Sequence, residues 1–297
     1  MKDLKDYIVW TAVVTPMNQD GSIDYDGFEK VLREQAAADN AITILASTGE
    51  GLNLDLAERK QILDFAINLK LDAPIMVGVG GVNLHDQLDW VGYLNGLAVD
   101  AYLLVVPLYA KPGVHGQYGW FKALLDLANK PCLLYNIPKR TGKSLELKTV
   151  EMLKDHPRFW GMKEASASEE DFTKYSQIAP NLQMLSGDDP MLPAFAKLGA
   201  KGVISVAANV WPEATHEFAR QNVGGTFEDH ELWDKAIAAL FCASNPVPAK
   251  ALLHDQGRIA SAEVRLPLSA QDMPDLAIVR DANQAIEDWL KAQDNRE

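Results

Sequence analysis

The stretch "FWGMKEAS" (residues 159–166) shows the pattern that decides the fold. It is a short apolar run that ends in a lysine, Lys163. The run is nearly continuous in its apolar character rather than alternating, which is typical of a strand buried on both faces, as in a parallel sheet. Lysine is rarely buried without a partner, so its position at the end of a core strand calls for an explanation.

Seven further apolar runs share this character. They are "TAVVTP" (11–16), "AITILAS" (41–47), "PIMVGVG" (74–80), "AYLLVVP" (101–107), "CLLYNIP" (132–138), "LQMLSGDD" (182–189) and "GVISVAANV" (202–210). Helical patterns fill the gaps between them, as in residues 54–70, where Asp55 followed by Glu58 indicates a helix start. Successive runs mostly begin about 25 to 33 residues apart, the size of one βα unit.

Eight strands that alternate with helices predict an α/β fold, a closed (β/α)8 TIM barrel. An open doubly wound sheet is the alternative, and the count of eight favours the barrel. After about residue 225 the strand pattern stops, and helical segments follow around 228–243, 246–256 and 275–293. We therefore predict a barrel domain over residues 1–225 and a C-terminal helical region over residues 226–297.

Composition excludes several classes of partner. The 297 residues carry a formal net charge of −13, which disfavours binding to nucleic acid and to anionic membranes. Neither a signal-peptide pattern nor an apolar run of about 18 residues is present, so we expect a cytoplasmic protein. Two cysteines, Cys132 and Cys242, are no disulfide framework, and Cys132 is expected to be a reduced core residue.

Motifs for cofactors are weak. The six histidines are scattered without metal-ligand spacing, and "GVGG" (78–81) lacks the glycine register of a dinucleotide-binding loop. The acidic "SGDDP" (186–190) argues against a phosphorylated substrate held after the seventh strand. Asp188 and Asp189 are compatible with metal binding, but their position favours capping of the next helix. These residues by themselves give little support for a metal or dinucleotide site.

Catalytic residues of such barrels lie at the C-terminal ends of the strands. The polar candidates there are Ser47, Thr48, Glu50, Tyr109, Lys111, Tyr135, Asn136, Arg140, Lys163, Glu164, Ser186, Asp188, Asp189, Ser205 and Asn209. A partly desolvated Lys163 would have a lowered pKa, and a neutral amine can form a Schiff base with a carbonyl. The alternative is that Lys163 extends to solvent or pairs with a carboxylate.

Two residues near Lys163 strengthen the catalytic interpretation. Tyr135 ends the neighbouring strand, where its phenol can exchange protons, although a buried tyrosine with a satisfied hydroxyl is also common. Arg140 lies five residues further on, and a guanidinium can bind a carboxylate with two hydrogen bonds, although a solvated surface arginine is the alternative. The three residues together are more specific than any one of them.

Six motifs carry a resemblance over roughly residues 8–290. They are "STGEG" (47–51), "YNIPKRTG" (135–142), "GMKEAS" (161–166), "LSGDD" (185–189), "GVISVAANV" (202–210) and "SNPVPAK" (244–250). In order and spacing they resemble the dihydrodipicolinate synthase / N-acetylneuraminate lyase family. Within this family, the stretch "NIPKRTG" with its arginine is similar to the synthases, since the sialic acid lyases and sugar-acid aldolases usually lack that arginine. The stretch "SNPVPAK" is also similar to the synthase pattern.

The resemblance implies a role for each matching residue. Lys163 matches the lysine that forms a Schiff base with pyruvate, and Tyr135 matches the general acid/base. Ser47 and Tyr109 match a proton relay in which the tyrosine reaches in from a neighbouring subunit. Four residues match substrate-binding positions: Thr48 for the pyruvate carboxylate, Ile204 beside it, Gly187 in the pocket lining, and Arg140 for the carboxylate of L-aspartate-4-semialdehyde. The resemblance implies no metal and no organic cofactor.

The chain also departs from the family. Leu108 replaces the first tyrosine of a pair that many bacterial synthases have after the fourth strand, and Tyr109 keeps the second. In inhibited members that first tyrosine belongs to the dimer interface and to the lysine feedback site. Other positions of that feedback site differ as well: Gly51, Leu56, Arg59, Val82 and Asp86. We therefore predict that L-lysine does not inhibit this protein.

Three functional hypotheses follow. The first, implied by the resemblance, is a Schiff-base lyase that condenses pyruvate with L-aspartate-4-semialdehyde to 4-hydroxy-tetrahydrodipicolinate in lysine and diaminopimelate biosynthesis. The second is a related pyruvate aldolase acting on a 2-keto-3-deoxy acid or a sialic acid, against which Arg140 argues. The third is a non-catalytic binding protein, against which the complete set of catalytic matches argues. The role of Tyr109 implies at least a dimer, and the family resemblance implies a homotetramer.

Overall fold

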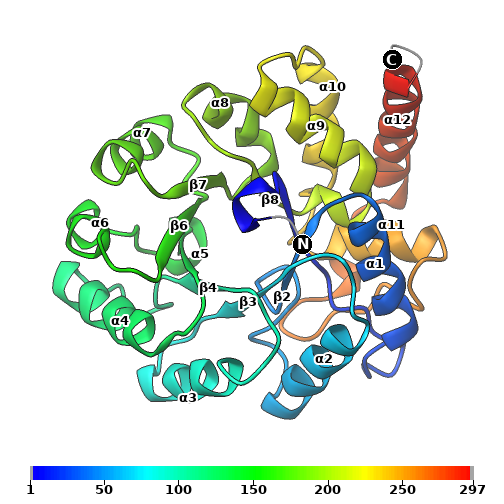
Figure 1. Ribbon diagram of the computed structural model, residues 1–297. Coiled ribbons are helices and arrows are strands. Elements are labelled where there is room, and N and C mark those ends of the chain that lie inside the picture. The colour runs from blue at the N-terminus through cyan, green and yellow to red at the C-terminus, as the bar shows by residue number, and fades with distance from the viewer. Residues whose placement is uncertain (1–2, 295–297) are drawn as a thin grey trace.

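The computed structural model describes residues 3–294 and shows a closed barrel of eight parallel strands (Figure 1). The strands follow one another around the barrel in sequence order, which confirms the predicted (β/α)8 fold. They are β1 (Val9–Ala12), β2 (Ala41–Ile44), β3 (Ile75–Val79), β4 (Ala101–Val105), β5 (Cys132–Asn136), β6 (Phe159–Glu164), β7 (Gln183–Ser186) and β8 (Val203–Ser205).

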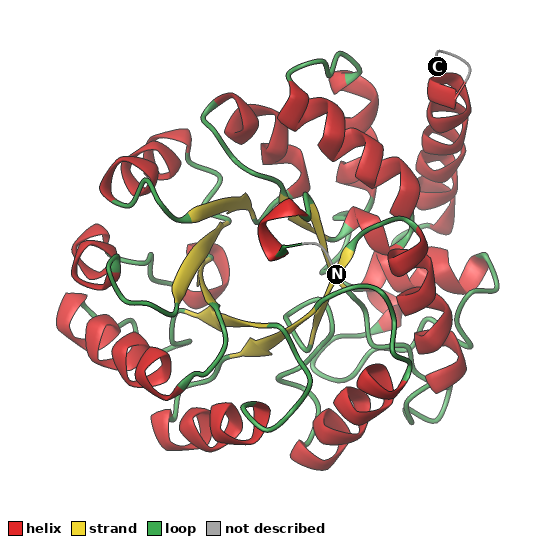
Figure 2. Ribbon diagram, viewed as in Figure 1, coloured by secondary structure: helices red, strands yellow, loops and turns green. Residues whose placement is uncertain are grey.

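A ring of helices surrounds these strands (Figure 2). The α-helices of the described residues up to 225 are α1 (Tyr25–Ala37), α2 (Leu56–Asn68), α3 (Leu84–Leu94), α4 (Val114–Leu127), α5 (Pro138–Thr141), α6 (Leu147–Leu153), α7 (Glu169–Ile178), α8 (Leu192–Lys197) and α9 (Pro212–Gly224). Helix α2 begins as predicted: the Asp55 carboxylate accepts from the Glu58 amide at 2.8 Å, and the Glu58 carboxylate accepts from the Asp55 amide at 3.0 Å.

The hydrophobic side chains form two cores because the strands are buried on both faces. The larger core lies between the strands and the helices, and Cys132, which is free, belongs to it. A smaller core fills the inside of the barrel and includes Tyr135, Ala165, Leu185 and Ile204. Successive strand residues point to opposite faces, so residues two apart from these positions also point inward.

Two predicted strands are misplaced or too long. The first run, 11–16, extends beyond β1, which begins at Val9, and the last run, 202–210, continues beyond β8 into a 3-10 turn, η3 (Ala207–Asn209). Both apolar extensions are buried because the turn folds over the end of β1. The Asn209 side chain accepts from the Val14 amide at 2.9 Å and donates to the Ala12 carbonyl at 2.8 Å. Asn209 is therefore a structural residue rather than a catalytic candidate.

The three predicted C-terminal helices are present as α10 (His230–Ala239), α11 (Val247–Asp255) and α12 (Leu276–Asp294). They lie on one side of the barrel, near α9 and α1 (Figure 1). The Arg265 guanidinium binds both Glu58 oxygens on α2, at 3.0 and 2.9 Å, so this region is tied to the barrel by charge as well as by packing. The division of the chain at residue 225 stays a prediction, and the ends of the two predicted regions, 1–2 and 295–297, lie outside the described residues.

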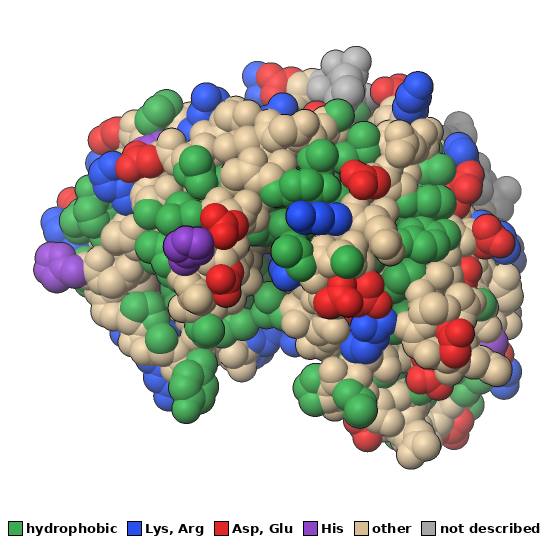
Figure 3. All heavy atoms as spheres, turned by 90° about the horizontal axis from the view of Figure 1, so that it is seen from below, with side chains coloured by type: hydrophobic (Ala, Val, Ile, Leu, Met, Phe, Trp, Pro, Cys, Tyr) green, Lys and Arg blue, Asp and Glu red, His purple; other side chains and the backbone are tan. Residues whose placement is uncertain are grey.

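Two further 3-10 helices are η1 (Leu4–Asp6) before β1, and η2 (Asp189–Met191) after β7. A fourth such turn, η4 (Ala270–Asp272), precedes α12. On the face of the molecule seen in Figure 3, acidic and basic side chains are interspersed with hydrophobic ones. Among residues 3–294, none of the helices combines the length and apolar character needed to cross a lipid bilayer.

Candidate active site

Lys163 and Tyr135 are direct neighbours at the C-terminal ends of β6 and β5. The two residues are paired in the register of these parallel strands. Ala165, two residues after Lys163, belongs to the inner core, so Lys163 points into the barrel. The Lys163 ammonium nitrogen, Nζ, lies 4.4 Å from the centroid of the Tyr135 ring.

The structural alternatives for Lys163 do not fit this geometry. Only 3% of the residue is exposed, so its amine does not extend to solvent. Within residues 3–294, Nζ has no carboxylate oxygen at ion-pair distance, 4.0 Å or less. Lys250 shows the contrast: it is completely buried too, but its Nζ lies 2.7 Å from Glu50 Oε1. Lys163 is thus a buried amine without a paired carboxylate.

Burial lowers the pKa of Lys163 to about 8, because the charged form loses its hydration. The carboxylates of Asp188 and Asp189 oppose this shift, and the guanidinium of Arg140 adds to it. A larger fraction of the amine is therefore neutral near physiological pH than in an ordinary lysine. A neutral, fixed amine is the form that attacks a carbonyl carbon.

Burial raises the pKa of Tyr135, so its phenol keeps its proton at neutral pH. The Arg140 charge and a hydrogen bond with the Ser47 side chain act in the opposite direction, and Asp188 adds to the increase. Tyr135 can therefore donate a proton and recover it through Ser47. These two hydroxyl groups are suited to proton transfer beside the amine.

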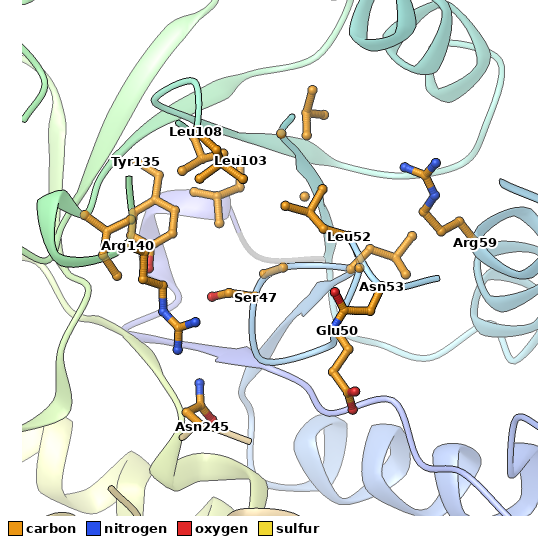
Figure 4. A pocket seen from close by; sticks show the side chains of 18 of the residues that line it. Ser47, Glu50, Leu52, Asn53, Arg59, Leu103, Leu108, Tyr135, Arg140 and Asn245 are labelled. Carbon is orange, nitrogen blue, oxygen red and sulfur yellow. The ribbon is translucent and has the colours of Figure 1, made fainter. Parts of the chain in front are cut away.

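A cavity of about 310 Å³ opens beside this group. Ser47 and Tyr135 line it from the ends of β2 and β5, and Arg140 lines it from α5. Figure 4 shows the Ser47 hydroxyl directed toward the side where Tyr135 and Arg140 lie, with Asn245 facing the Arg140 guanidinium. The volume suits a small ligand, and the lining combines apolar walls with a few polar groups, as is usual in small-molecule sites.

Of the predicted substrate-binding residues Thr48, Gly187 and Ile204, Gly187 lies directly against Lys163. The residues that line the 310 Å³ cavity include neither Lys163 nor these three. Thr48 is buried, and its Oγ1 accepts a hydrogen bond from Asn245 at 3.0 Å. A Cβ on Gly187 would lie 2.9 Å from Lys163 Cγ, so only glycine leaves room for the lysine. Ile204 belongs to β8 and to the inner core.

Tyr109 is the one predicted catalytic residue that lies apart from this group. It is 92% exposed and has a left-handed backbone, with φ of 64°. The neighbouring Leu108 lines the cavity instead. A single chain therefore leaves Tyr109 outside its own candidate site.

Other strand-end candidates have structural partners. The Asn136 amide donates to Glu164 at 2.8 Å, and the remaining oxygens of the pair accept from the amides of Leu145 and Ser166. The prediction that Asp189 caps the next helix was wrong. Its carboxylate accepts instead from the amides of Val206 and Ala207, in the buried segment after β8. Asp188, for which the same capping was predicted, precedes η2 without a capping hydrogen bond from its side chain.

Sequence reasoning missed two residues of the C-terminal region, Asn245 and Lys250. Asn245 lines the cavity, and Lys250 pairs with Glu50 in the loop that carries Ser47 and Thr48. A signal for Lys250 was present, since it interrupts a buried apolar stretch, residues 247–253, just as Lys163 ends one.

Comparison with known proteins shows to which family this barrel belongs. The model of the Dihydrodipicolinate synthetase family matches residues 7–285. The chain belongs to this family. Its curated relatives include the 4-hydroxy-tetrahydrodipicolinate synthase of Wolbachia pipientis subsp. Culex pipiens (strain wPip), 45% identical over 96% of this chain and 98% of the relative. The enzyme of that name from Francisella tularensis subsp. novicida (strain U112) is 44% identical over 95% of this chain and 96% of the relative.

Solved structures of family members share the fold. The dihydrodipicolinate synthase of Thermotoga maritima superposes with a TM-score of 0.89 at 27% identity, covering 95% of this chain and 98% of that structure. The chloride-inhibited dihydrodipicolinate synthase of Acinetobacter baumannii in complex with pyruvate gives 0.86 at 30% identity, covering 95% and 98%. The family relationship therefore extends over the barrel and the C-terminal helices.

Proposed function

We propose that this family member is a 4-hydroxy-tetrahydrodipicolinate synthase, a lyase of lysine and diaminopimelate biosynthesis. It condenses pyruvate with L-aspartate-4-semialdehyde through a Schiff base on Lys163. One observation supports the chemistry above all others. Lys163 is a buried amine without an ion-paired carboxylate, with its pKa lowered to about 8, and it lies beside the phenol of Tyr135.

The reaction begins when the neutral Lys163 amine attacks the keto carbon of pyruvate. Tyr135 supplies the proton with which the carbonyl oxygen leaves as water, and the iminium forms. The iminium withdraws electrons, so the Tyr135 phenolate takes a proton from the methyl group and an enamine results. The enamine carbon then attacks the aldehyde carbon of the second substrate, whose oxygen takes the proton back from Tyr135. Water or the substrate's own amine adds to the regenerated iminium and releases the product from the Lys163 amine.

Binding of the two substrates divides between two groups of residues. The Thr48 hydroxyl holds the pyruvate carboxylate, with Ile204 and Gly187 on either side of the adduct. Arg140 binds the carboxylate of L-aspartate-4-semialdehyde with its two parallel N–H groups. Its position at the cavity, on the short helix α5, supports this assignment.

The role proposed for Tyr109 requires more than one subunit. Its exposed phenol completes the proton relay of a second subunit, so the active form is at least a dimer, and we propose a homotetramer. Large exposed apolar side chains near this surface, Leu52 at 55% and Val82 at 60%, support a covered face. We also propose that the enzyme acts in the cytoplasm, away from nucleic acid and membranes.

Condensation of pyruvate with L-aspartate-4-semialdehyde by the purified protein tests the proposal. Wild-type protein should form 4-hydroxy-tetrahydrodipicolinate, and Lys163→Ala should not. Borohydride reduction with pyruvate should leave a stable adduct on the Lys163 peptide. An unmodified Lys163 peptide would contradict the Schiff-base mechanism, whereas a trapped adduct without condensation would mean a different aldehyde substrate.

A further inference from the structure

Asn245 lies between the candidate pyruvate-binding residue and the cavity. It is 6% exposed, lines the cavity, and its Nδ2 donates to Thr48 Oγ1 at 3.0 Å. Its Oδ1 is buried and has no hydrogen-bond partner among the described residues. Figure 4 shows the side chain at the edge of the cavity, opposite Arg140.

The segment that carries Asn245 is fixed against the loop that carries Thr48. Five residues after Asn245, Lys250 forms its completely buried ion pair with Glu50, two residues after Thr48. The other Glu50 oxygen accepts from the Arg265 amide at 2.6 Å. The two segments therefore touch at two points, and the amide of Asn245 has a set position relative to the Thr48 hydroxyl.

The direction of this hydrogen bond has a chemical consequence. A hydroxyl has one proton to donate and lone pairs to accept with. Because the Asn245 amide donates to Oγ1, the Thr48 proton is not used in this contact and stays available to an acceptor on a ligand. A carboxylate offers only acceptors, so it requires a donor there.

We propose that Asn245 is a positioning residue that turns the Thr48 hydroxyl into a hydrogen-bond donor for the carboxylate of the keto acid. The inference rests on the proposed function, since it assigns pyruvate to Lys163 and its carboxylate to Thr48. With the reverse hydrogen bond, Thr48 would present a lone pair to the carboxylate and repel it. Asn245 thus determines the affinity for pyruvate without touching the reacting atoms.

Asn245→Asp is the sharpest test because it preserves shape and reverses the hydrogen bond. The ionised aspartate can only accept, so Thr48 must donate to it, and a negative charge is added near the bound carboxylate. We expect the pyruvate concentration for half-maximal borohydride trapping on Lys163 to rise about tenfold or more. Protonation of the new carboxyl restores a donor, so the ratio of the variant's value to the wild-type value should fall as the pH is lowered.

Asn245→Ala and Thr48→Val provide the second measurement. Asn245→Ala should raise the half-maximal pyruvate concentration by a smaller, pH-independent factor relative to wild type. In the Thr48→Val background, which lacks the hydroxyl, the same alanine substitution should have no further effect. The KM for the semialdehyde should change little in Asn245→Ala, whereas in Asn245→Asp the new carboxylate faces Arg140 and should raise that KM as well.

Trapping needs no aldehyde, so the outcomes separate the two proposals. If wild-type protein traps no pyruvate, the proposed function fails. Two outcomes would overturn the role of Asn245 in a protein whose wild type traps pyruvate. In one, Asn245→Asp has the same half-maximal pyruvate concentration as wild type. In the other, the ratio of the two half-maximal concentrations does not change with pH. Additive effects of Asn245→Ala and Thr48→Val on the half-maximal pyruvate concentration would also overturn this role. This second test remains available if Asn245→Asp does not fold.

Discussion

Lys163 Nζ lies 4.4 Å from the ring centroid of Tyr135, whereas Lys250 Nζ lies 2.7 Å from a carboxylate oxygen of Glu50. Both lysines are buried, yet, of the two, only Lys250 has a carboxylate oxygen from residues 3–294 at ion-pair distance. A buried, unpaired ammonium is destabilised relative to the neutral amine, whereas a paired one is compensated. The first arrangement prepares an amine for reaction, and the second holds two segments together.

Adduct formation should therefore depend on pH with a midpoint near the lowered pKa of Lys163, about 8. The neutral amine gains population as the pH rises, so the initial rate of pyruvate capture should rise up to about pH 8 and level off above it. At pH 7 about one amine in ten is neutral, against about one in 3,000 for a lysine with a pKa of 10.5. Borohydride trapping at fixed times measures this rate, and a midpoint near 10 would contradict the prediction.

Gly187→Ala should displace Lys163. The added methyl group would lie 2.7 Å from Ala165 Cβ and 2.9 Å from Lys163 Cγ, distances that force one of them to move. Since small misplacements of a reacting group are costly, we expect pyruvate capture to fall about 100-fold.

Gly119→Ala in α4 is the matched control. Its side chain would meet no atom within 4 Å, so activity should be unchanged, and the helix should gain about 0.5–1 kcal/mol of stability. Equal activity in the two variants would show that Gly187 is not required for the placement of Lys163.

Lys250→Met should destabilise the protein strongly. It leaves the Glu50 carboxylate buried without its partner, which typically costs about 3–5 kcal/mol of unfolding free energy. The double variant Glu50→Gln/Lys250→Met removes both charges and should recover much of this loss. Urea unfolding measures the difference.

The exposed pair Lys235 and Glu231 is the control for this experiment, since Lys235→Met breaks an ion pair of 2.6 Å that is open to solvent. It should leave the unfolding midpoint unchanged. If the single and double variants of the buried pair were equally unstable, the cost would come from lost packing rather than from an unpaired charge.

Lys163 and Lys250 show what sequence patterns can predict. Lys163 ends an apolar run, and barrels of this type carry their active sites at the C-terminal ends of such strands. The location of Lys163 in the fold could therefore be predicted from the local sequence. The partner of Lys250, in contrast, lies 200 residues away in the chain, and no local pattern points to it. Strand positions were predictable, but their ends were not. The apolar run past β8 forms the buried turn η3, and Asn209 in this turn donates to the Ala12 carbonyl at the end of β1.

L-Lysine should leave the condensation rate unchanged at millimolar concentration. Arg59 stands where the family resemblance leads us to expect a histidine, and its guanidinium lies 5.2 Å from the Trp90 ring centroid beside a cavity that Asp86 also lines. A second cation next to Arg59 would be repelled. The initial rate with and without lysine, against sodium chloride at equal ionic strength, measures the effect, and a severalfold decrease would contradict the prediction.

Tyr109 should act across a subunit interface, which mixed oligomers can test. We expect Tyr109→Phe and Lys163→Ala to be nearly inactive by themselves. In a hybrid that contains both subunits, the site with an intact Lys163 receives an intact Tyr109 from its neighbour, whereas the other site lacks both groups. Mixing the two inactive proteins after dissociation and reassociation should therefore restore activity, up to about half the wild-type value per hybrid dimer.

The exposure of Tyr109, 92%, makes this outcome specific. If Tyr109 served its own chain, each hybrid site would lack one group and no activity would return. Hybrids of Lys163→Ala with Tyr135→Phe provide the control: Tyr135 and Lys163 are register partners within one chain, so neither subunit can supply what the other lacks. Recovery in the Tyr109 hybrid alone would place that phenol in the neighbouring active site, and recovery in neither would mean that the relay does not cross the interface.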